Sequence, residues 1–474
     1  MYKAYITALS NVRPHPNADK LRLADVFGNT VCVSLDYYEG QVGLYLPSDG
    51  QISVEFGEKN NLLRKKDDAG NNIGGYIDAV KRNITAIRLR GEKSDGLFLP
   101  LSCLNYCYAH GDASIELRVG DVIDGVVNGH DICTKYIPRT NHRQGHVSEG
   151  NKTRKKRAAT APLFAEHADT EQLAYNLGAF KAGDEIEITL KCHGTSQRTG
   201  YLPVLKGYKR TLLDRILRRE GKPIYDWGYV SGTRRVVLEN YEGGFYGDNT
   251  FREQHSKMFE GKLNKGETVY YEVVGFTTSG APIMGSVDNK KMQDKEFIKQ
   301  YGATTTFSYG CSPDGVAEIT VPGLPYSPVV DRPQSDIYVY RMTMTNEDGF
   351  VVEYTPDFMR YRCEQMGVKT VPVFARMKLQ EGGGFLFRND GTYSAVAESD
   401  LGEFVMAAAE EFYDGTDPIG KTHIREGVVV RILNRPKFAA YKHKNFAFKV
   451  LEGIAKVNAE APDMEEAQDV SENT

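Results

Sequence analysis

The 474-residue sequence has few of the features of a secreted or membrane-bound protein. Its seven cysteines are odd in number and scattered, without the spacing of a disulfide framework. No basic-then-apolar leader opens the chain at MYKAYITALS, and no apolar run approaches the length that spans a membrane. We therefore expect a soluble, cytoplasmic protein in a reducing environment, without a membrane partner.

Basic and acidic residues are nearly balanced in number. The sequence has 59 Lys and Arg against 63 Asp and Glu, which gives a net charge of -4. A nucleic-acid partner would have to be held by local basic patches, and the global charge neither supports nor excludes one. With 41% hydrophobic residues the composition is globular, and the length suggests two domains, or three with insertions.

Soft metal ligands are also sparse. Cys103, Cys107 and His110 lie close together, but three ligands without a second Cys/His pair do not close a tetrahedral site. We expect this stretch, which follows LFLPLS, to form one amphipathic helix instead.

Residues 1–138 consist of short strands separated by turn residues, a pattern that suggests a small antiparallel β-barrel. The loop RPHPNADKLRLADV and the turn LRGEKSDGLFLP are similar to the OB-fold domain of the tRNA-binding type and to the OB domain that opens the Deinococcus-type RNA ligases. The resemblance implies nucleic-acid binding, although exposed basic residues are often no more than a solvated surface. The candidate contacts are Lys20, Arg22, Arg88, Arg90 and Lys93.

The rest of the chain divides by composition. Residues 139–157 hold seven Lys and Arg with a single Glu, so we expect 139–160 to form a basic linker, either a phosphate-binding arm or a plain tether. Residues 161–456 mix β-rich and helical stretches, which indicates an α+β fold built on antiparallel sheets. The acidic residues 457–474 are expected to form a disordered tail.

Local signals predict several elements of the second domain. Asp169 as an N-cap, with Gln172 three residues later, predicts the start of a helix. The Asp-Gly pairs at 348–349 and 390–391 are hairpin signals. ETVYYEVVGF, DIYVYRMTM and EGVVVRIL indicate strands, whereas DFMRYRCEQMG and LGEFVMAAAEEFY indicate helices.

Lys191 follows a strand-like alternation in EIEITLKCHGTS. The apolar residues of this stretch alternate with polar ones, so a strand puts Lys191 on the face opposite the apolar side chains. By itself the K-x-x-G spacing of Lys191 and Gly194 is a weak signal, since roughly three chance matches are expected in a chain of this length. Cys192, next to the lysine, is interpreted as a space-filling residue.

Four further signals follow Lys191 in the sequence. They are Glu272 in VYYEVVGF, Tyr338 and Tyr340 in DIYVYRMT, Glu426 in REGVVVRI, and Lys442 and Lys444 in AYKHKNFAFKV, with Lys449 as a second candidate for the lysine pair. A nucleophilic lysine, two acids, an aromatic residue and a lysine pair are the parts needed to adenylate an amine.

The charged residues suit the phosphate chemistry of that reaction. A lysine amine must lose its proton before it attacks the α-phosphate of ATP, and neighbouring cations favour that loss. Lys442 and Lys444 would supply this field and neutralise phosphate charge in the transition state. Glu426 is suited to bind Mg²⁺ or Mn²⁺, because such ions prefer oxygen ligands and bridge phosphates.

The remaining residues suit the nucleoside. Glu272 would accept hydrogen bonds from the ribose hydroxyls, and Tyr340, or else Tyr338, would stack on adenine. Arg234 or its neighbour Arg235 would hold a phosphate with two parallel hydrogen bonds.

In this order the residues resemble the covalent nucleotidyltransferase superfamily of ligases and capping enzymes. Most of that superfamily has Asp where this sequence has His193, and K-x-H-G-T is similar to the RNA ligases that seal nicks in duplex RNA. HADTEQ, KCHGTSQR, REGVVVRI and YKHKN all resemble the Deinococcus-type family, so the resemblance covers nearly the whole chain. It implies an ATP-grasp-like nucleotidyltransferase domain after the OB domain. The implied site residues are the catalytic Lys191, Lys442 and Lys444, the nucleotide-binding His193, Gly194, Arg234, Glu272 and Tyr340, and the metal ligand Glu426.

Domain order supports the same family. DNA ligases and capping enzymes place their OB domain after the nucleotidyltransferase domain, but here only about thirty residues follow Lys444. The resemblance therefore implies an ATP-dependent RNA ligase, a monomer acting on nicked duplex or broken RNA. Two alternatives stay open: a capping-type guanylyltransferase, and an RNA-binding protein whose adenylation site is vestigial.

Overall fold

A computed structural model describes most of the chain. It covers residues 2–136 and 159–457, apart from short stretches at 49, 67–71, 168–169, 212–213, 215–220, 235, 239–240, 242–245, 247–248, 381–383, 388–392, 398–399 and 453–454. Most of the predicted basic linker and the acidic tail after residue 457 lie outside the described residues. None of the helices in the described part combines the length and the apolar character that crossing a bilayer needs.

The chain divides into two compact units. Unit 1 consists of Met1–His146, Asp288–Gln300 and Phe446–Thr474, and unit 2 consists of Val147–Val287 and Tyr301–Asn445. Both units therefore combine segments that are far apart in the sequence. Residues 288–300 and 446–456, which the sequence pattern assigned to the second domain, group with unit 1.

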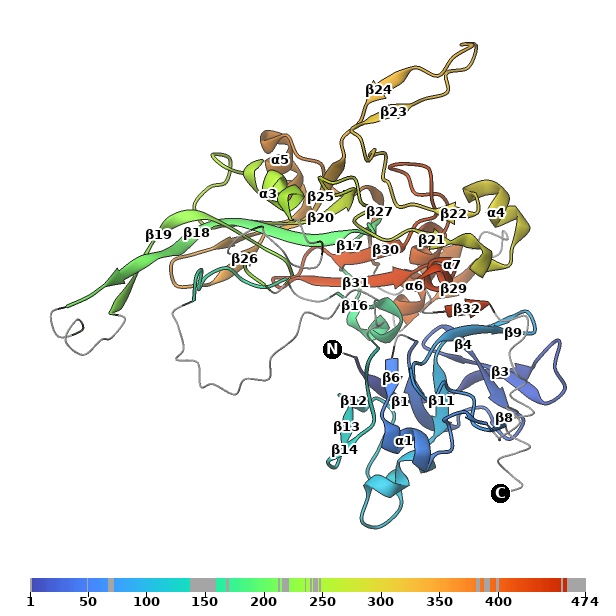
Figure 1. Cartoon of the computed structure of the whole chain (residues 1–474). Coiled ribbons are helices and arrows are strands. Elements are labelled where there is room, and N and C mark those ends of the chain that lie inside the picture. The colour runs from blue at the N-terminus through green and yellow to red at the C-terminus, as the bar shows by residue number, and fades with distance from the viewer. Residues whose placement is uncertain are drawn as a thin grey trace. The chain divides into compact units, whose positions relative to one another are not determined.

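Unit 1 is built from small sheets (Figure 1). Its largest sheet has the antiparallel order β11-β5-β1-β12, with the bounds Leu97–Pro100, Val42–Leu46, Ala4–Ala8 and Val122–Ile123. A second antiparallel sheet, β2-β3-β4, spans Ser10–Pro14, Leu21–Val26 and Asn29–Ser34. No closed barrel is found among the described residues, so the OB barrel remains a prediction.

Shorter elements complete the N-terminal part of unit 1. The strand pairs are β6 (Gly50–Ile52) with β15 (Cys133–Lys135), β13 (Val126–Val127) with β14 (His130–Asp131), and β7 (Lys65–Lys66) with β8 (Asn72–Gly74). The helical segments are α1 (Val54–Lys59) and the 3-10 helices η1 (Leu101–Cys107) and η2 (Ala113–Ile115). The helix predicted after LFLPLS is therefore present, but with the tighter 3-10 geometry.

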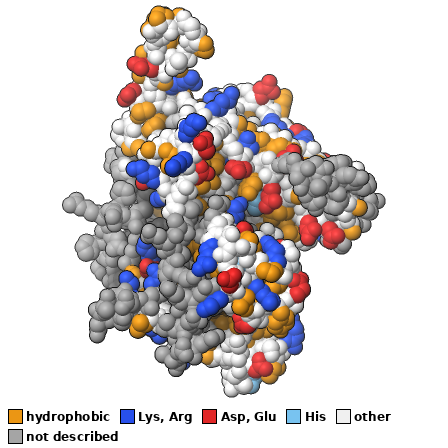
Figure 2. Space-filling model, turned by 90° about the vertical axis from the view of Figure 1, so that its right-hand side faces the viewer, with side chains coloured by type: hydrophobic (Ala, Val, Ile, Leu, Met, Phe, Trp, Pro, Cys, Tyr) orange, Lys and Arg blue, Asp and Glu red, His pale blue; other side chains and the backbone are white. Residues whose placement is uncertain are grey.

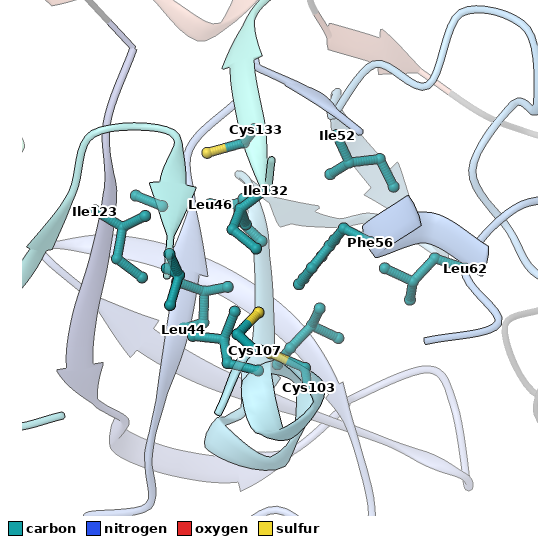
Figure 3. Packing of buried hydrophobic residues seen from close by; sticks show 14 of the residues in the cluster. Leu44, Leu46, Ile52, Phe56, Leu62, Cys103, Cys107, Ile123, Ile132 and Cys133 are labelled. Carbon is teal, nitrogen blue, oxygen red and sulfur yellow. The ribbon is translucent and has the colours of Figure 1, made fainter. Parts of the chain in front are cut away.

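One apolar cluster forms the core of unit 1 (Figure 3). Phe56 from α1 points into it beside Leu46 and Ile132, and all three side chains are fully buried. Removing such surface from water is the main favourable term in folding, at roughly 25 cal/mol for each Å² of apolar surface. The cluster therefore ties α1 to strands on both sides of it in the sequence.

The three soft ligands considered in the sequence lie in different environments. Cys103 and Cys107 face the apolar core from η1, and burial raises the pKa of both thiols. His110 lies at the surface, where Nε2 is 3.1 Å from Glu116 Oε1. All seven cysteines of the chain are buried and free of disulfides.

The C-terminal segment of unit 1 packs beside β9 (Ala86–Leu89), which also pairs with β10 (Glu92–Ser94). Helix α7 (Phe446–Leu451) buries Phe446 and Val450 against Ala86. Strand β32 (Ala455–Val457) then pairs with β9 in parallel. These contacts explain why the last folded residues group with the N-terminal part of the chain.

Lys449 in α7 is an ion-pair partner within unit 1. Its Nζ donates to Asp95 Oδ2 over 2.5 Å. Asp95 is buried and also accepts a hydrogen bond from Ser48 Oγ. Because a buried carboxylate needs a partner, Lys449 has a structural task that the sequence pattern did not reveal.

The basic residues suggested for nucleic-acid contact lie mainly at the surface of unit 1. Lys20, Arg90 and Lys93 are exposed, and Lys93 Nζ lies 5.0 Å from the centre of the Phe446 ring. Arg22 is half-buried and donates to the Tyr37 carbonyl over 3.0 Å. The side chain of Arg88 lies outside the described residues.

Unit 2 contains two five-stranded sheets (Figure 1). The first has the order β16-β31-β30-β17-β27, with the bounds Glu171–Gln172, Ala439–Lys444, Gly427–Ile432, Glu185–Leu190 and Val373–Lys378. The second has the order β19-β18-β20-β25-β26, with the bounds Lys222–Gly232, Thr195–Lys209, Glu267–Gly275, Ser335–Thr345 and Val351–Glu353. All neighbouring strands are antiparallel except β16 and β31, so the mixed fold with antiparallel sheets is confirmed.

The helices of unit 2 follow their sequence signals. Helix α5 (Pro356–Met366) begins with Thr355, whose side chain accepts from the Phe358 amide, and ends at Gly367 with φ 69°. Helix α6 spans Leu401–Tyr413, so both predicted helices are confirmed. The other helical segments of unit 2 among the described residues are α3 (Thr250–Lys257), η3 (Leu173–Tyr175) and η4 (Leu177–Ala179). The segment 288–300 of unit 1 contains η5 (Asn289–Met292) and all but the last residue of α4 (Lys295–Tyr301).

The hairpin signals have different outcomes. The turn at 348–349 joins β25 to β26 as predicted. The turn at 390–391 lies outside the described residues, although β28 (Gly384–Phe387) and β29 (Tyr393–Val396) on either side of it are paired. A further hairpin, β23 (Val316–Glu318) with β24 (Val329–Asp331), projects from unit 2 in both views (Figures 1 and 2). The remaining short strands are β21 (Val287–Asp288) and β22 (Thr304–Thr305).

The helix predicted from Asp169 is wrong. Asp169 itself lies outside the described residues, and Glu171–Gln172 forms β16, which pairs in parallel with β31. The 3-10 turns η3 and η4 follow, and no α-helix is formed by the described residues there. Pairing with a strand distant in sequence overrides the local capping signal here.

Candidate functional site

The alternation that ends at Lys191 has the predicted consequence. Ile186, Ile188 and Leu190 are buried to 1% exposure or less. Glu187, Thr189 and Lys191 line a cavity of about 250 Å³ that is bounded by residues of both sheets of unit 2. The strand therefore places the lysine ammonium at a cavity, away from the main apolar side of β17.

Strand register brings three lysines to the same wall of this cavity. Thr189 on β17 pairs with Val429 on β30, which pairs with Lys442 on β31. Lys444 pairs with Gly427, whose carbonyl accepts from the Lys191 amide over 3.0 Å. Since residues opposite one another in a sheet point to the same side, all three ammonium groups reach the cavity.

The opposite wall comes from the second sheet. Glu272 on β20, Tyr340 on β25 and Arg234 after β19 all line the cavity. The Tyr340 hydroxyl is 2.9 Å from Ser196 Oγ, and Ser196 pairs across strands with Glu272. The sequence left Tyr338 and Arg235 as alternatives to Tyr340 and Arg234.

Tyr338 does not line the cavity. Its hydroxyl donates to Asp336 over 3.3 Å. Arg235 lies outside the described residues. Lys449 belongs to unit 1, where it contacts Asp95.

Gly194 is required by packing within the protein. A Cβ at this position would lie 2.3 Å from the carbonyl oxygen of Val273 and 2.9 Å from Cγ of Glu272. The glycine therefore lets the segment after Lys191 approach β20, which links the two walls of the cavity.

Glu426 is the electrostatic centre of the site. It is 2% exposed, and its Oε1 is 2.7 Å from Lys191 Nζ and 3.0 Å from Lys444 Nζ. Burial alone would raise its pKa, but Lys191, Lys444 and His193 together lower the pKa well below its ordinary value. The residue is therefore held as a carboxylate between two ammonium groups.

The second oxygen of Glu426 is available for another ligand. Oε2 has no hydrogen-bond partner among the described residues, and His193 Nδ1 lies 3.7 Å from it. The His193 amide donates to the Tyr309 hydroxyl over 2.6 Å, and its ring meets Phe307 edge-on at 4.7 Å. A buried carboxylate oxygen without a donor is the type of atom that binds a hard cation.

The pKa of Glu272 is shifted in the opposite direction from that of Glu426. Burial raises its pKa to about 7, and the negative charge of Glu426 acts in the same direction. Lys191 and Arg234 act against this rise without cancelling it. Two carboxyl groups near one lysine thus have pKa values moved in opposite directions, a pattern common at functional sites.

Replacing Glu272 with Gln should stabilise the protein in a pH-dependent way. Because the folded state binds this proton more tightly than the unfolded chain, the contribution of Glu272 to stability falls as pH rises from 4.5 to about 7. The substitution removes that loss, so we expect the free energy of unfolding to increase by on the order of 2 kcal/mol near pH 8. Urea unfolding of both proteins measures it, and a stabilisation that does not shrink below about pH 5 would contradict this origin.

Cys192 and His167 also line the cavity. Burial raises the pKa of the Cys192 thiol well above its ordinary value. The His167 amide donates to the Arg234 carbonyl over 3.1 Å, and its Nδ1 accepts from Arg341 Nη1 at 3.1 Å. Its ring centre is 5.1 Å from that of Tyr340.

His167 was missed as a site residue by the sequence reasoning. HADTEQ stood out only as part of a family resemblance, and no local pattern assigned a role to its histidine. The same is true of Arg360 and Arg431, which also line the cavity; Arg360 donates to both oxygens of Glu187 over 3.2 and 2.9 Å. Only the meeting of separate strands and helices reveals these residues.

Comparison with known proteins gives a likeness at the level of structure. No protein-family model matches the sequence, and no curated protein matches it. The Naegleria gruberi RNA ligase with pyrophosphate has a TM-score of 0.53 at 16% identity, over 94% of this chain and 97% of that chain. Variants of that ligase with ATP and manganese (15% identity, 96% and 98% covered) and with AMP and manganese (16%, 95% and 98%) have the same TM-score, 0.53. The likeness shows a shared fold.

Proposed function

We propose that this protein is an ATP-dependent RNA ligase that joins 3′-hydroxyl and 5′-phosphate ends through a covalent lysyl-AMP intermediate. The observation that carries the proposal is the cluster of Lys191, Glu426 and Lys444, whose two lysines line a cavity of about 250 Å³. The shared fold with an RNA ligase solved with ATP and with AMP supports it. The motifs add the finer proposal of a Deinococcus-type enzyme that repairs nicked or broken RNA.

The cavity suits a nucleotide from end to end. We propose that a purine lies between Tyr340 on one sheet and Val429 on the other, and the presence of both side chains in the cavity lining supports this. Glu272 is close enough to Lys191 to influence it, and its carboxyl group would accept hydrogen bonds from ribose hydroxyls. The three lysines and Arg234 would surround the phosphates.

The first step transfers AMP to the protein. The Lys191 ammonium releases a proton, its nitrogen attacks the α-phosphorus of ATP, and the Nζ–P bond forms. The bond from that phosphorus to the oxygen bridging to the β-phosphorus breaks, pyrophosphate leaves with the electron pair, and the nitrogen loses a second proton. Lys442 and Lys444 would stabilise the charge that develops on the leaving group.

The next two steps use RNA. An oxygen of the RNA 5′-phosphate attacks the same phosphorus, the Nζ–P bond breaks, and Lys191 regains a proton. A neighbouring 3′-hydroxyl then loses its proton and attacks the RNA 5′-phosphorus, forming the phosphodiester as AMP leaves. The N-terminal unit and the basic linker are proposed to hold the RNA.

A divalent cation, Mg²⁺ or Mn²⁺, fits the residues present. The free Oε2 of Glu426 is a buried oxygen ligand, and Mg²⁺ commonly uses one or two carboxylates while keeping several waters. When bound, the ion would supply charge to the phosphates and help to lower the proton affinity of the amine. The manganese in the Naegleria ligase structures belongs to that protein, and a metal here is our proposal.

Further aspects of the proposal concern the molecule in the cell. Seven buried cysteines without a disulfide support a reducing compartment, and we propose a cytoplasmic location. We also propose that the enzyme is a monomer, because each residue of the proposed catalytic cluster comes from one chain.

Incubation with α-labelled ATP and a divalent cation, followed by denaturing electrophoresis, tests the function. We expect a covalently labelled protein band that disappears when pyrophosphate is added, and we expect sealing of nicked RNA. Labelling by GTP in place of ATP would indicate the capping-type guanylyltransferase. Absence of any labelled protein would leave the RNA-binding alternative.

Lys444→Met and Lys449→Met should have different effects. Lys444 contacts Glu426 at the cavity, so its loss should slow self-adenylation by about a hundredfold. Lys449 contacts Asp95 in unit 1, so its loss should lower the unfolding temperature and leave the adenylation rate of the folded protein unchanged. Single-turnover labelling and thermal unfolding of both variants measure this, and the reverse pattern would assign Lys449 to the catalytic pair.

A further inference from the structure

Strands β18 and β19 form an arm that extends beyond the rest of their sheet (Figure 1). β18 pairs with β20 only as far as Gly200, but it pairs with β19 as far as Lys209. The part of the arm beyond Gly200 is therefore a two-stranded ribbon. Such a ribbon has one strand on each edge and two faces that can differ in chemistry.

One face of the arm carries a group of flat side chains. Tyr201 pairs across strands with Tyr229, and Pro203 pairs with Trp227. The Tyr201 and Tyr229 rings stack with centres 4.7 Å apart, and the Trp227 ring is 5.9 Å from that of Tyr201. All four residues are half-buried. We call Tyr201, Tyr229 and Trp227, together with the neighbouring Pro203, the aromatic plate.

The other face of the arm is already covered. Leu202 and Val204 point to that side and pack against Ala161 and Phe164. The Leu205 amide also donates to the Thr160 carbonyl over 2.8 Å. The aromatic plate lies on the opposite face. There Tyr201 and Tyr229 pack in part against the apolar cluster that contains Phe259 and Leu263, and the Tyr229 hydroxyl accepts from the Gly261 amide over 2.6 Å, so the rings are only partly exposed.

Positive charge lies beside the plate and at the tip of the arm. Lys265 Nζ lies 5.2 Å from the centre of the Trp227 ring. Lys209 and Lys222, both exposed, pair directly across the strands. Like charges in that position destabilise a sheet, and a bound anion would relieve the repulsion. In β18 and β19 the single acidic residue is Asp226, whose carboxylate accepts from the Trp227 amide.

We propose that the aromatic plate and its lysines bind single-stranded RNA at the end to be joined. This inference rests on the proposed ligase function and names where its RNA substrate lies. Flat rings stack on bases of any sequence, and lysines neutralise the phosphates between them. β18 also begins four residues after Lys191, so the same strand leads from the catalytic lysine to the plate.

The second projecting hairpin has the opposite character. Leu324, Tyr326 and Val329 are exposed on the β23–β24 hairpin, and Figure 2 shows apolar side chains there at the top of the view. No Lys or Arg occurs between residues 313 and 331. An exposed tyrosine without neighbouring cations should not bind RNA, so Tyr326 supplies a matched control for the aromatic plate.

Tryptophan fluorescence can be used to follow binding at this site, because Trp227 is the single tryptophan of the protein. We would titrate the full-length protein with a 5′-phosphorylated single-stranded RNA of about twelve nucleotides and follow tryptophan emission, without ATP. We expect the emission to be quenched as RNA binds. Quenching by heparin to the same extent would indicate charge binding alone and would overturn stacking.

Three variants complete the experiment. Trp227→Leu should weaken RNA binding about tenfold when measured by anisotropy of labelled RNA, whereas Trp227→Tyr and Tyr326→Ala should bind like the wild type. Replacing both Lys209 and Lys222 with Gln should make the log-log salt slope less steep by about 1.4, at about 0.7 per contact on a single strand. Unfolding midpoints equal to that of the wild type would exclude a folding defect in these variants. If Trp227→Leu misfolds, the double lysine variant tests the site, and Trp227→Tyr serves as its folded control.

The outcomes separate this proposal from the function itself. Unchanged RNA affinity in Trp227→Leu, or an unchanged salt slope in the double lysine variant, would overturn the RNA site on the arm. Quenching by an acidic peptide but not by RNA would make the plate a protein-docking surface instead. Failure of the wild-type protein to form the ATP adduct would overturn the ligase function, whatever the RNA titration shows.

Discussion

Lys191→Ala abolishes the labelling of the protein by α-labelled ATP, the largest effect we expect from any single substitution. Lys191 is the cavity lysine that contacts the buried Glu426 carboxylate at 2.7 Å, and our mechanism forms the phosphoramidate on its nitrogen. Lys191→Arg should fail equally, because a guanidinium stays protonated and is not a nucleophile. The measurement is the amount of covalent adduct after denaturation.

The control for this prediction separates adduct formation from later chemistry. Both Lys191 variants should still seal an RNA that already carries AMP on its 5′-phosphate, since that step does not use the phosphoramidate. Full labelling of Lys191→Ala would end the proposed mechanism. Loss of both labelling and sealing in Lys191→Ala, together with a lowered unfolding temperature, would show a folding defect. The Lys191→Arg variant would then serve as the test.

Glu426→Gln should reduce self-adenylation by about a hundredfold or more. The substitution removes the charge that Lys191 and Lys444 share through one oxygen, at 2.7 and 3.0 Å, and leaves two ammonium groups facing each other. It also removes the free Oε2 that we propose as a cation ligand. Rates of adduct formation over a range of Mg²⁺ and Mn²⁺ concentrations measure both effects.

Glu426→Asp is the matched variant. It keeps the charge and shortens the side chain by one methylene, so we expect partial activity that rises with metal concentration. Glu426→Gln should not respond to added metal. Equal rates for wild type and Glu426→Gln would show that the ion pairs are structural and would remove Glu426 from the mechanism.

The sequence by itself determined features that depend on local periodicity and local backbone preference. The alternation before Lys191 set which face of β17 carries the ammonium, because side chains alternate strictly along a strand. Thr355 and Gly367 bounded α5, because their side-chain and backbone preferences act within one helical turn. The order of motifs along the chain also singled out residues that the structure brings to one cavity.

Local patterns failed where a distant partner decided the outcome. Glu171–Gln172 carries a helix signal but pairs with β31, some 270 residues later in the chain, and became a strand. Lys449 was indistinguishable by sequence from a catalytic lysine until its contact with Asp95 placed it in unit 1. A closed OB barrel is likewise a matter of pairing between strands, and the described residues do not show one.

Only the tertiary structure decided how the site is assembled. The sharing of Glu426 Oε1 by Lys191 and Lys444 depends on the register of β17 with β30 and β31, which lie more than 200 residues after β17 in the sequence. The position of His167 beside Tyr340 depends on the contact between the loop that carries His167 and strand β25. Hydrogen bonding between strands and the burial of side chains fix such registers, and neither is encoded in a local stretch of residues.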